Sequence, residues 1–522
     1  MPTEMHLSRW HRVRLVAEGA VIGLAVGALI ALYRYLLSNS ETLLRLCTGW
    51  LLQHGALVVL WFVALLIICF VVDRLMMFEP YTQASGIPQI DAEVSGHISM
   101  PWYRVVPTKL AEGVLCAFSG LSLGREGPSV LLGGMAAKGV NRIFGRGQTR
   151  AHERLMVTCG AAAGMSAAFH APLTGVLFAV EEIHKEFSAS LIISAMTSSV
   201  VADFVSSHLL GVTPLIHLVV YKTAPHALYP AILLMGVICG VLGSLHNAGM
   251  FFVQDKLYGP FETKTPFVRM AVPFVLAGVL AFVWPDLLCG GDAIVERVMN
   301  IRNETMLTIL ALLVGKYVFT TICFGSGAPG GTLFPLVVMG LLVGALYGMG
   351  VSNVAGIPYA YVNSFIVLGV AGLFSAVIQA PVTAVVMVFE LTGSMEALLA
   401  TSVVSIVSYV TATLLRTDAY YEHLYARMLG KAKAMQLSGV RHGHEMLKRY
   451  VIGVGSRVDG LTVRDVAWPE GVLVVTVREA GIKKIVKGST PLNALNEITV
   501  VMDEYDETKT DELMHGLCDP RD

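Results

Sequence analysis

The sequence predicts a polytopic all-α membrane protein that carries a small water-soluble α+β domain at its C-terminal end. Of the 522 residues, 55% are hydrophobic and only 14% are charged, whereas soluble domains have about 25% charged residues. Several apolar stretches reach the roughly 17–25 residues that a membrane-spanning helix needs. The net charge of −1 at pH 7 and the lack of a basic run indicate no nucleic-acid partner.

Uninterrupted apolar stretches predict the spanning helices. They lie at residues 15–37, 56–77, 189–211, 227–253, 305–324 and 397–415. Shorter apolar stretches, bounded by Gly or Pro, lie at 110–123, 129–140, 171–180, 333–349 and 380–391. Helices that stop inside a membrane are tolerated only where the broken backbone faces protein or a cavity. We therefore expect half-helices around a pathway.

The charges at both ends of the membrane region predict that both termini are cytoplasmic. Arg9, Arg12 and Arg14 precede the first span, and seven Lys or Arg residues lie within 416–449, after the last span. Basic segments next to spanning helices remain on the cytoplasmic side. Two cytoplasmic ends require an even number of crossings.

Two segments of the membrane region resemble each other, which predicts an internal repeat. AFHAPLTGVLFAVEE (168–182) aligns with VIQAPVTAVVMVFEL (377–391), with Thr174 on Thr383 and Glu181 on Glu390. Transporter repeats often have inverted topology, with the substrate site between them. The sequence establishes the duplication and leaves the inversion open.

Three Gly-rich breaks precede apolar helices: ASGIPQI (84–90), GREGPS (124–129) and GSGAPGGTLFP (325–335). Proline favours the first turn of a helix, and glycine lets the backbone approach a ligand closely. A helix that begins inside the membrane presents unpaired N–H groups with partial positive charge. Several such ends aimed at one point form an anion site. A structural kink is the alternative for any single break, but three breaks favour the anion site.

Acids in these segments are functional candidates, because ionisable groups inside a membrane are costly. Glu126 stands at the mouth of the predicted site, where its carboxylate can act as a tethered anion. Protonation would release it, so one group can serve as gate and as proton acceptor. Glu181 and Glu182 end an apolar segment, and for this pair a helix end among the lipid headgroups is an equal alternative.

Together the motifs resemble the CLC family of chloride channels and chloride/proton antiporters over residues 15–430. The resemblance implies a homodimer in membrane lipid, about 18 helices per subunit, an inverted repeat, and chloride and protons as the transported ions. Because the sequence has no metal-ligand spacing, nucleophile elbow or phosphate loop, we expect no cofactor, no metal and no enzyme activity. The chloride-binding positions that carry over are Ser85, Thr332, Leu333 and Tyr421. Glu126 matches the external gate, Glu182 the internal proton-transfer glutamate, and Lys109 and Arg125 the buried basic residues that raise the local potential.

The same resemblance bears on whether the protein is an antiporter or a channel. Antiporters carry an acid at the position of Glu182, which favours chloride/proton exchange; a passive voltage- or ligand-gated chloride channel is the alternative. Ser85 favours chloride over nitrate and, with the intact GREGP, argues against the fluoride branch. The chain departs from the family pattern at four positions: Ala84 for glycine, Gln89 for glutamate, His170 for asparagine and Leu333 for phenylalanine. The last change removes an aromatic ring from the site. His170 is expected to be a neutral buried side chain, with a proton relay as the alternative.

The C-terminal residues predict a separate domain. We expect a membrane domain over 1–430, a linker over 431–447 and a cytoplasmic domain over 448–522. In the last, the pattern predicts a helix at 460–468, strands at 472–479, 482–487 and 498–505, and a helix at 506–518.

The tail has a resemblance of its own. GSRVDGLTVRDVAWPEGVLVV is similar to the TrkA-C domain, the C-terminal half of RCK units, although Asn496 and Glu497 replace its usual Gly-Asp. The resemblance implies regulation or pairing, with a small nucleotide such as cyclic di-AMP as a possible ligand. The paired CBS domains of animal CLC proteins are absent from the pattern, which favours a prokaryotic inner or plasma membrane.

Overall fold

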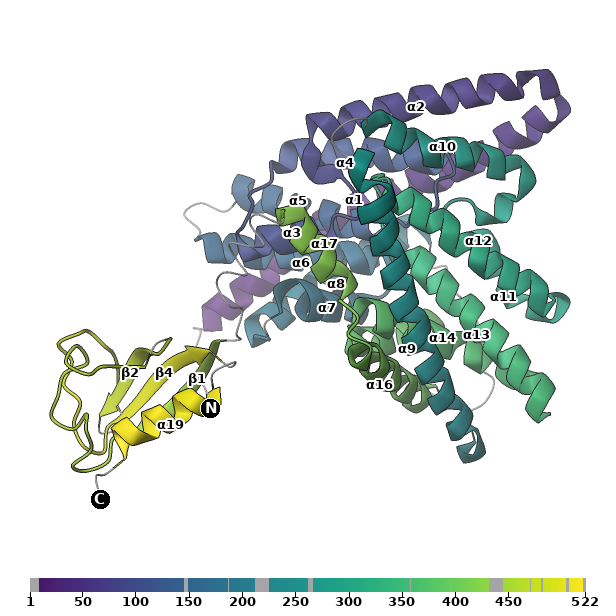
Figure 1. The fold of residues 1–522 in the computed structure, drawn as a ribbon. Coiled ribbons are helices and arrows are strands. Elements are labelled where there is room, and N and C mark those ends of the chain that lie inside the picture. Colours follow the sequence, from purple (N-terminus) through teal and green to yellow (C-terminus); the bar gives the residue numbers. More distant parts are fainter. Residues whose placement is uncertain are drawn as a thin grey trace. The chain divides into compact units, whose positions relative to one another are not determined.

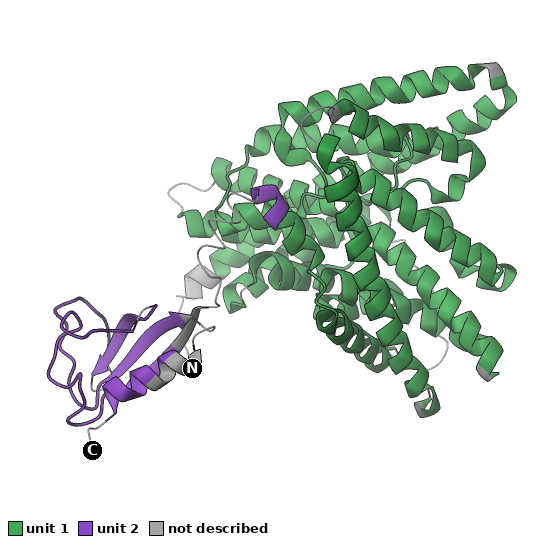
Figure 2. Ribbon diagram, in the orientation of Figure 1, with its two compact units in different colours: residues 1–425 green, residues 426–522 purple. Residues whose placement is uncertain are grey.

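The computed structural model describes residues 9–519 apart from 145–148, 186, 212–224, 262–265, 357, 394, 396, 431–444, 470, 480–481 and 504–506. The chain divides into two compact units, residues 1–425 and 426–522 (Figure 2). The first unit is helical and the second is built on a sheet (Figure 1). Most of the expected linker 431–447 lies outside the described residues.

Among the described residues of the first unit, seven helices are long and apolar enough to cross a membrane. They are α1 (Arg9–Gln53), α2 (Val58–Phe78), α8 (Ala189–Leu210), α9 (Tyr229–Phe252), α12 (Met306–Gly325), α13 (Leu333–Ala355) and α14 (Val362–Ile378) with the short turn before it. The other helices are α3 (Ile87–Ser95), α4 (Trp102–Phe118), α5 (Glu126–Phe144), α6 (Arg150–Phe169), α7 (Pro172–Phe178), α10 (Pro266–Val283), α11 (Asp292–Met299), α15 (Pro381–Thr392), α16 (Leu398–Leu414) and α17 (Tyr420–Leu429).

Three expected segments have other bounds in the structure. Helix α1 continues well past residue 37, because Leu44 and Leu51 extend its buried face through a stretch of mixed polarity. Helix α4 begins at Trp102 and contains Pro107 beyond its first turn, so the Tyr103 carbonyl lacks the intrahelical N–H donor that residue 107 would otherwise supply. Helix α13, expected to be short, is one of the seven long apolar helices.

The predicted duplication is a structural repeat. Helix α5 packs on α6 as α13 packs on α14, α6 packs on α8 as α14 packs on α16, and α1 packs on α8 as α9 packs on α16. In both halves glycines allow the backbones to touch. A Cβ on Gly133 would collide with the carbonyl of Gly160, and a Cβ on Gly369 would collide with that of Gly340. Small residues at such crossings are typical of helices packed in a membrane.

Helices α7 and α15, which carry the aligned segments, run antiparallel. Glu181 follows α7 and accepts a hydrogen bond from the Thr383 N–H, 2.9 Å away, in the first turn of α15. Glu390 lies near the end of α15 and accepts one from the Thr174 N–H, 2.7 Å away, in the first turn of α7. The end of each helix therefore lies at the start of the other, which is the relation expected of an inverted repeat.

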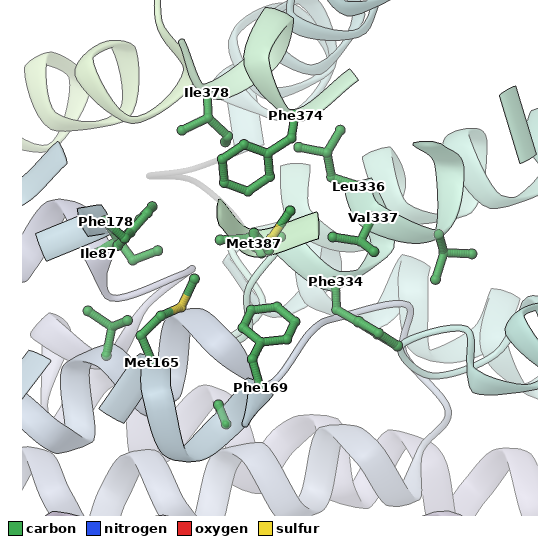
Figure 3. Packing of buried hydrophobic residues seen from close by; sticks show 14 of the residues in the cluster. Ile87, Met165, Phe169, Phe178, Phe334, Leu336, Val337, Phe374, Ile378 and Met387 are labelled. Atoms are coloured by element: carbon green, nitrogen blue, oxygen red, sulfur yellow. The ribbon is translucent and has the colours of Figure 1, made fainter. Parts of the chain in front are cut away.

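The buried core of the first unit lies between the two halves. Figure 3 shows side chains of α6, α13, α14 and α15 gathered in it: Met165, Phe169, Phe334, Phe374 and Met387. The helix starts that form the candidate site are embedded in this core.

The second unit contains one antiparallel sheet with strand order β1-β4-β2-β3. Its elements are β1 (Glu445–Val451), β2 (Leu473–Glu479), β3 (Ile482–Ile485), β4 (Glu497–Asp503) and α19 (Glu507–Cys518). Helix α19 packs on β1 and β4 (Figure 1), where Met514 and Cys518 join the buried Tyr450, Ile498 and Val500.

Two expectations for this unit are wrong. Strand β1 was not predicted; it begins at Glu445, inside the expected linker, and pairs with β4 along its whole length. The stretch 460–468 forms turns and a bridge from Thr462 to Pro491 rather than a helix. The Asp465 carboxylate accepts hydrogen bonds from the Thr462 N–H and hydroxyl, and such local bonds compete with a helix.

Candidate anion site and proton path

Backbone hydrogen bonds hold the three Gly-rich breaks together. Gly124 and Gly331 exchange two bonds, with N···O distances of 2.6 and 2.9 Å, and the Ala84 N–H donates to the Gly327 carbonyl at 3.3 Å. Helices α3, α5 and α13 all begin at this junction. Their first N–H groups lack intrahelical acceptors and carry partial positive charge. The geometry therefore assembles the helix starts that an anion site needs.

Ser85 lies at the centre of the junction and is fully buried. A Cβ on Gly127 would collide with the Ser85 hydroxyl and would lie 3.3 Å from the Gly331 Cα. Glycine at position 127 is thus required for the three chains to approach one another. The Ser85 hydroxyl has no hydrogen-bond partner among the described residues, which leaves it available to an anion.

The Glu126 carboxylate is fully buried in the first turn of α5. Its Oε1 lies 3.8 Å from the Arg125 Nε. Neither carboxylate oxygen has a hydrogen bond of normal geometry to a described residue. Burial disfavours the ionised carboxylate, whereas the Arg125 guanidinium and the partial positive charge of the helix start favour it. Such a group is suited to change its charge or its place.

The start of α13 and the start of α17 close the junction. The Thr332 hydroxyl donates to the Tyr420 hydroxyl at 3.1 Å. The neighbouring Tyr421 hydroxyl is buried, lies near Ser85, and is within electrostatic range of both Glu126 and Glu182. It has no hydrogen bond of normal geometry to a described residue. Tyr420 was missed in the sequence, where only the second tyrosine of the pair matched the family motif.

The sequence predicts that Leu333 removes an aromatic ring from the site, but the next residue, Phe334, places a ring there. Leu333 is fully buried, and the ring of Phe334 lies beside the junction. The Arg125 guanidinium stands 5.7 Å from the centre of that ring. A Cβ on Gly124 would lie 3.2 Å from the Phe334 Cβ. The aromatic group is shifted by one position and remains beside the site.

Two fully buried lysines fix the loops that lead into the short helices. The Lys109 ammonium donates to the carbonyls of Thr82 and Ala84, at 2.6 and 2.7 Å, just before Ser85. The Lys316 ammonium donates to the carbonyls of Leu287 and Cys289, at 3.1 and 2.7 Å, just before α11. Lys316 was missed, although a lone lysine inside the apolar stretch 305–324 was a usable signal.

The structure separates the two acids of the EE pair. Glu181 is bound to the first turn of α15, whereas Glu182 has no hydrogen bond to a described residue. Glu182 lies on a π-helical turn, Ala179–His184, within electrostatic range of Lys185. The Lys185 ammonium is 3.1 Å from a Glu422 carboxylate oxygen and 3.9 Å from one of Asp91. Glu181 is therefore engaged in the contact between the two halves, whereas Glu182 is not hydrogen-bonded to a described residue.

Two family departures have simple structural counterparts. Ala84 has a φ of 52°, the left-handed conformation that glycine adopts without cost. The Gln89 amide donates to the Gln83 carbonyl at 2.7 Å. Both residues act on the loop that carries Ser85.

A cavity of about 630 Å³ is lined by Glu41, Arg45, Asp292 and other residues. It shares Glu41, Cys289 and Asp292 with a smaller cavity that is lined by Arg125 and Phe334. Two of the three shared residues are acidic.

The fold defines an integral membrane protein, and the junction is a candidate anion site within it. A family model described as voltage gated chloride channel matches residues 64–413. The chain is 31% identical over 400 residues to the H(+)/Cl(-) exchange transporter ClcA of Vibrio campbellii, covering 74% of this chain and 85% of that protein. It is 31% identical over 364 residues to ClcA of Salmonella agona, covering 69% and 76%. The chain therefore belongs to the voltage gated chloride channel (CLC) family.

Solved structures agree with this assignment. The structure of a slow cyanobacterial Cl-/H+ antiporter matches with a TM-score of 0.75 and 28% identity, covering 80% of this chain and 98% of that one. A CLC-type fluoride/proton antiporter and a eukaryotic CLC transporter, both 20% identical with TM-scores of 0.64, share the fold.

Proposed function

We propose that the protein is a chloride/proton antiporter. One observation carries the proposal: the Tyr421 hydroxyl, beside Ser85, is within electrostatic range of two acids that have no hydrogen bonds to described residues, Glu126 and Glu182. A channel needs a single gate. Two such acids, both coupled to one residue of the proposed anion site, are what a proton path through the protein requires. The names of the curated relatives support the same function.

Chloride is held by Ser85, Tyr421 and the backbone N–H groups at Thr332 and Leu333. Ionised Glu126 competes with chloride for the same helix starts, because both are anions. Protonation makes Glu126 neutral, so the carboxyl group leaves and chloride enters. The proton then passes toward Glu182, and chloride moves in the opposite direction. Arg125 and Lys109 add positive potential that favours both anions.

Reconstitution in liposomes tests the proposal. A chloride gradient should drive protons against their own gradient. Glu126→Ala should leave chloride flux and abolish proton movement, and Glu182→Gln should do the same. Glu479→Gln, which removes an exposed carboxylate of the second unit, is the control and should change neither flux. Chloride movement in the native protein without any proton movement would support the passive channel instead.

We infer further that the second unit regulates transport. Its resemblance to TrkA-C domains supports a small nucleotide ligand, and its position after a cationic segment supports a cytoplasmic location. Calorimetric titration of the full-length protein with cyclic di-AMP and adenine nucleotides tests this, with a variant truncated after residue 430 as the control. Heat of binding that persists in the truncated variant, or none in either, would leave pairing of subunits as the role.

We also propose a homodimer in a prokaryotic inner or plasma membrane. The outward sides of α8 and α16 carry large exposed apolar side chains, including Phe204, Leu399 and Ile406. These helices flank the antiparallel pair α7 and α15, so one flat apolar face spans both halves. Mass measurement of the protein in detergent should give twice the subunit mass.

A further inference from the structure

A buried hydrogen-bonded chain joins three helices close to the gate. The Arg34 Nη1 on α1 lies 2.7 Å from the Nε2 of His170, the residue that ends α6. The His170 Nδ1 lies 2.9 Å from an Asp203 carboxylate oxygen on α8. Arg34 is 9% exposed and the His170 side chain is 8% exposed. The chain Arg34–His170–Asp203 is therefore largely removed from solvent.

The partners of His170 determine its tautomer. The guanidinium of Arg34 has only donors, so the Nε2 of His170 must accept from it and carries no proton. The single ring proton of a neutral imidazole then lies on Nδ1 and is donated to Asp203. His170 in this arrangement is neutral, with an acid on one side and a permanent cation on the other.

The position of Arg34 matters to the gate. Besides His170, its Nη1 donates to the Ala167 carbonyl at 3.0 Å and to the Ser206 hydroxyl at 3.2 Å. The guanidinium is within electrostatic range of Arg125 and Glu126. Arg34 thus adds to the positive potential that attracts an anion to the start of α5.

The remaining groups around His170 are few. The Ser207 hydroxyl lies 2.9 Å from Nδ1. Glu390, on α15, is within electrostatic range of Asp203. The ring nitrogens of His170 thus contact Arg34, Asp203 and Ser207.

We propose that His170 is a positioning residue that makes the place of Arg34, and with it the potential at the Glu126 gate, depend on pH. A proton on Nε2 would set an imidazolium N–H against the guanidinium N–H groups. Two cations without an acceptor between them repel, while Asp203 retains the imidazolium. Arg34 then moves away from the gate. Protonation of the ring would therefore weaken the attraction of chloride to the gate.

The substitution His170→Asn tests this, because an amide oxygen can still accept from Arg34 but cannot be protonated over the pH range of the assay. The inference rests on the proposed transport function, so chloride efflux from liposomes is measured alone, whether or not protons are coupled. Acidification from about pH 7.5 to about pH 5 should raise efflux more in His170→Asn than in the native protein. We expect a difference of about threefold or more, since moving one charge several ångströms from an anion changes its energy by more than RT. If chloride efflux depends on pH in the same way in His170→Asn and in the native protein, the proposal is wrong.

Three further comparisons make the test more specific. His208→Asn removes an exposed histidine of α8, the helix that carries Asp203, and should leave the native profile. Asp203→Asn removes the anion that retains the imidazolium, so its profile should move toward that of His170→Asn; a native profile would contradict the proposal. In an Arg34→Met background, His170→Asn should have no further effect on the profile. An undiminished effect there would show that His170 acts without Arg34.

Discussion

The reciprocal contacts of Glu181 and Glu390 lead to a prediction about two adjacent acids. Glu181 should stabilise the fold, whereas its neighbour Glu182 should be needed for proton movement. Helices α7 and α15 begin with Ala-Pro, and an alanine at the N-cap has no oxygen to satisfy the first N–H groups. The missing oxygen is supplied by a glutamate from the opposite half, Glu390 for α7 and Glu181 for α15. Glu181 accepts from the Val382 N–H at 3.3 Å, the Thr383 N–H at 2.9 Å and the Thr383 hydroxyl at 2.6 Å.

The cost of removing this cap follows from its bonds. A hydrogen bond to a charged group contributes about 1.5–3 kcal/mol, and an N-cap about 0.5–2 kcal/mol. The longest of the three bonds is weak and Glu181 is partly exposed, so the sum is smaller than three full bonds. We expect Glu181→Ala to lower the free energy of unfolding by about 2–4 kcal/mol. Glu390→Ala should have a similar effect. Glu182→Ala breaks no hydrogen bond to a described residue and should cost less than about 1 kcal/mol.

Denaturant titration in detergent, followed by tryptophan fluorescence, measures the three unfolding free energies. The flux assay gives the second readout: Glu182→Ala should lose proton movement, whereas Glu390→Ala should retain it in the folded fraction. Equal destabilisation by Glu181→Ala and Glu182→Ala would refute the reasoning. So would an unchanged stability of Glu181→Ala.

Three other predictions follow from single positions. Gly127→Ala should abolish chloride transport, since its methyl group collides with the Ser85 hydroxyl; chloride flux at the native rate would contradict the packed junction. Ala84→Gly should stabilise the protein by up to about 1 kcal/mol, because relief of about 1–2 kcal/mol at positive φ exceeds the entropy cost of about 0.4–1 kcal/mol, whereas Ala92→Gly inside α3 should destabilise it. Burial raises the pKa of the Cys518 thiol to about 11, so near pH 8 it should react with iodoacetamide only after the second unit unfolds, as mass spectrometry of its tryptic peptide would show.

Much of the site could be predicted because its signals are local. Glycine and proline at a helix start, and acids in apolar stretches, are visible in a few consecutive residues. The three Gly-rich breaks and Glu126 therefore predicted one anion site without any knowledge of contacts, and the family resemblance added Ser85 and Thr332. The second unit was less predictable: β1 and the turns of 460–468 depend on pairing with β4 and on the local bonds of Asp465.

The sequence by itself determined the membrane class, the duplication and the residue types of the gate, because hydropathy and motif spacing are properties of adjacent residues. Only the tertiary structure decided the inversion of the repeat and the different roles of Glu181 and Glu182. It also decided that Lys316 fixes a loop and that His170 bridges Arg34 and Asp203. Each of these depends on which helix end or carbonyl lies opposite a side chain, and such partners are distant in the chain.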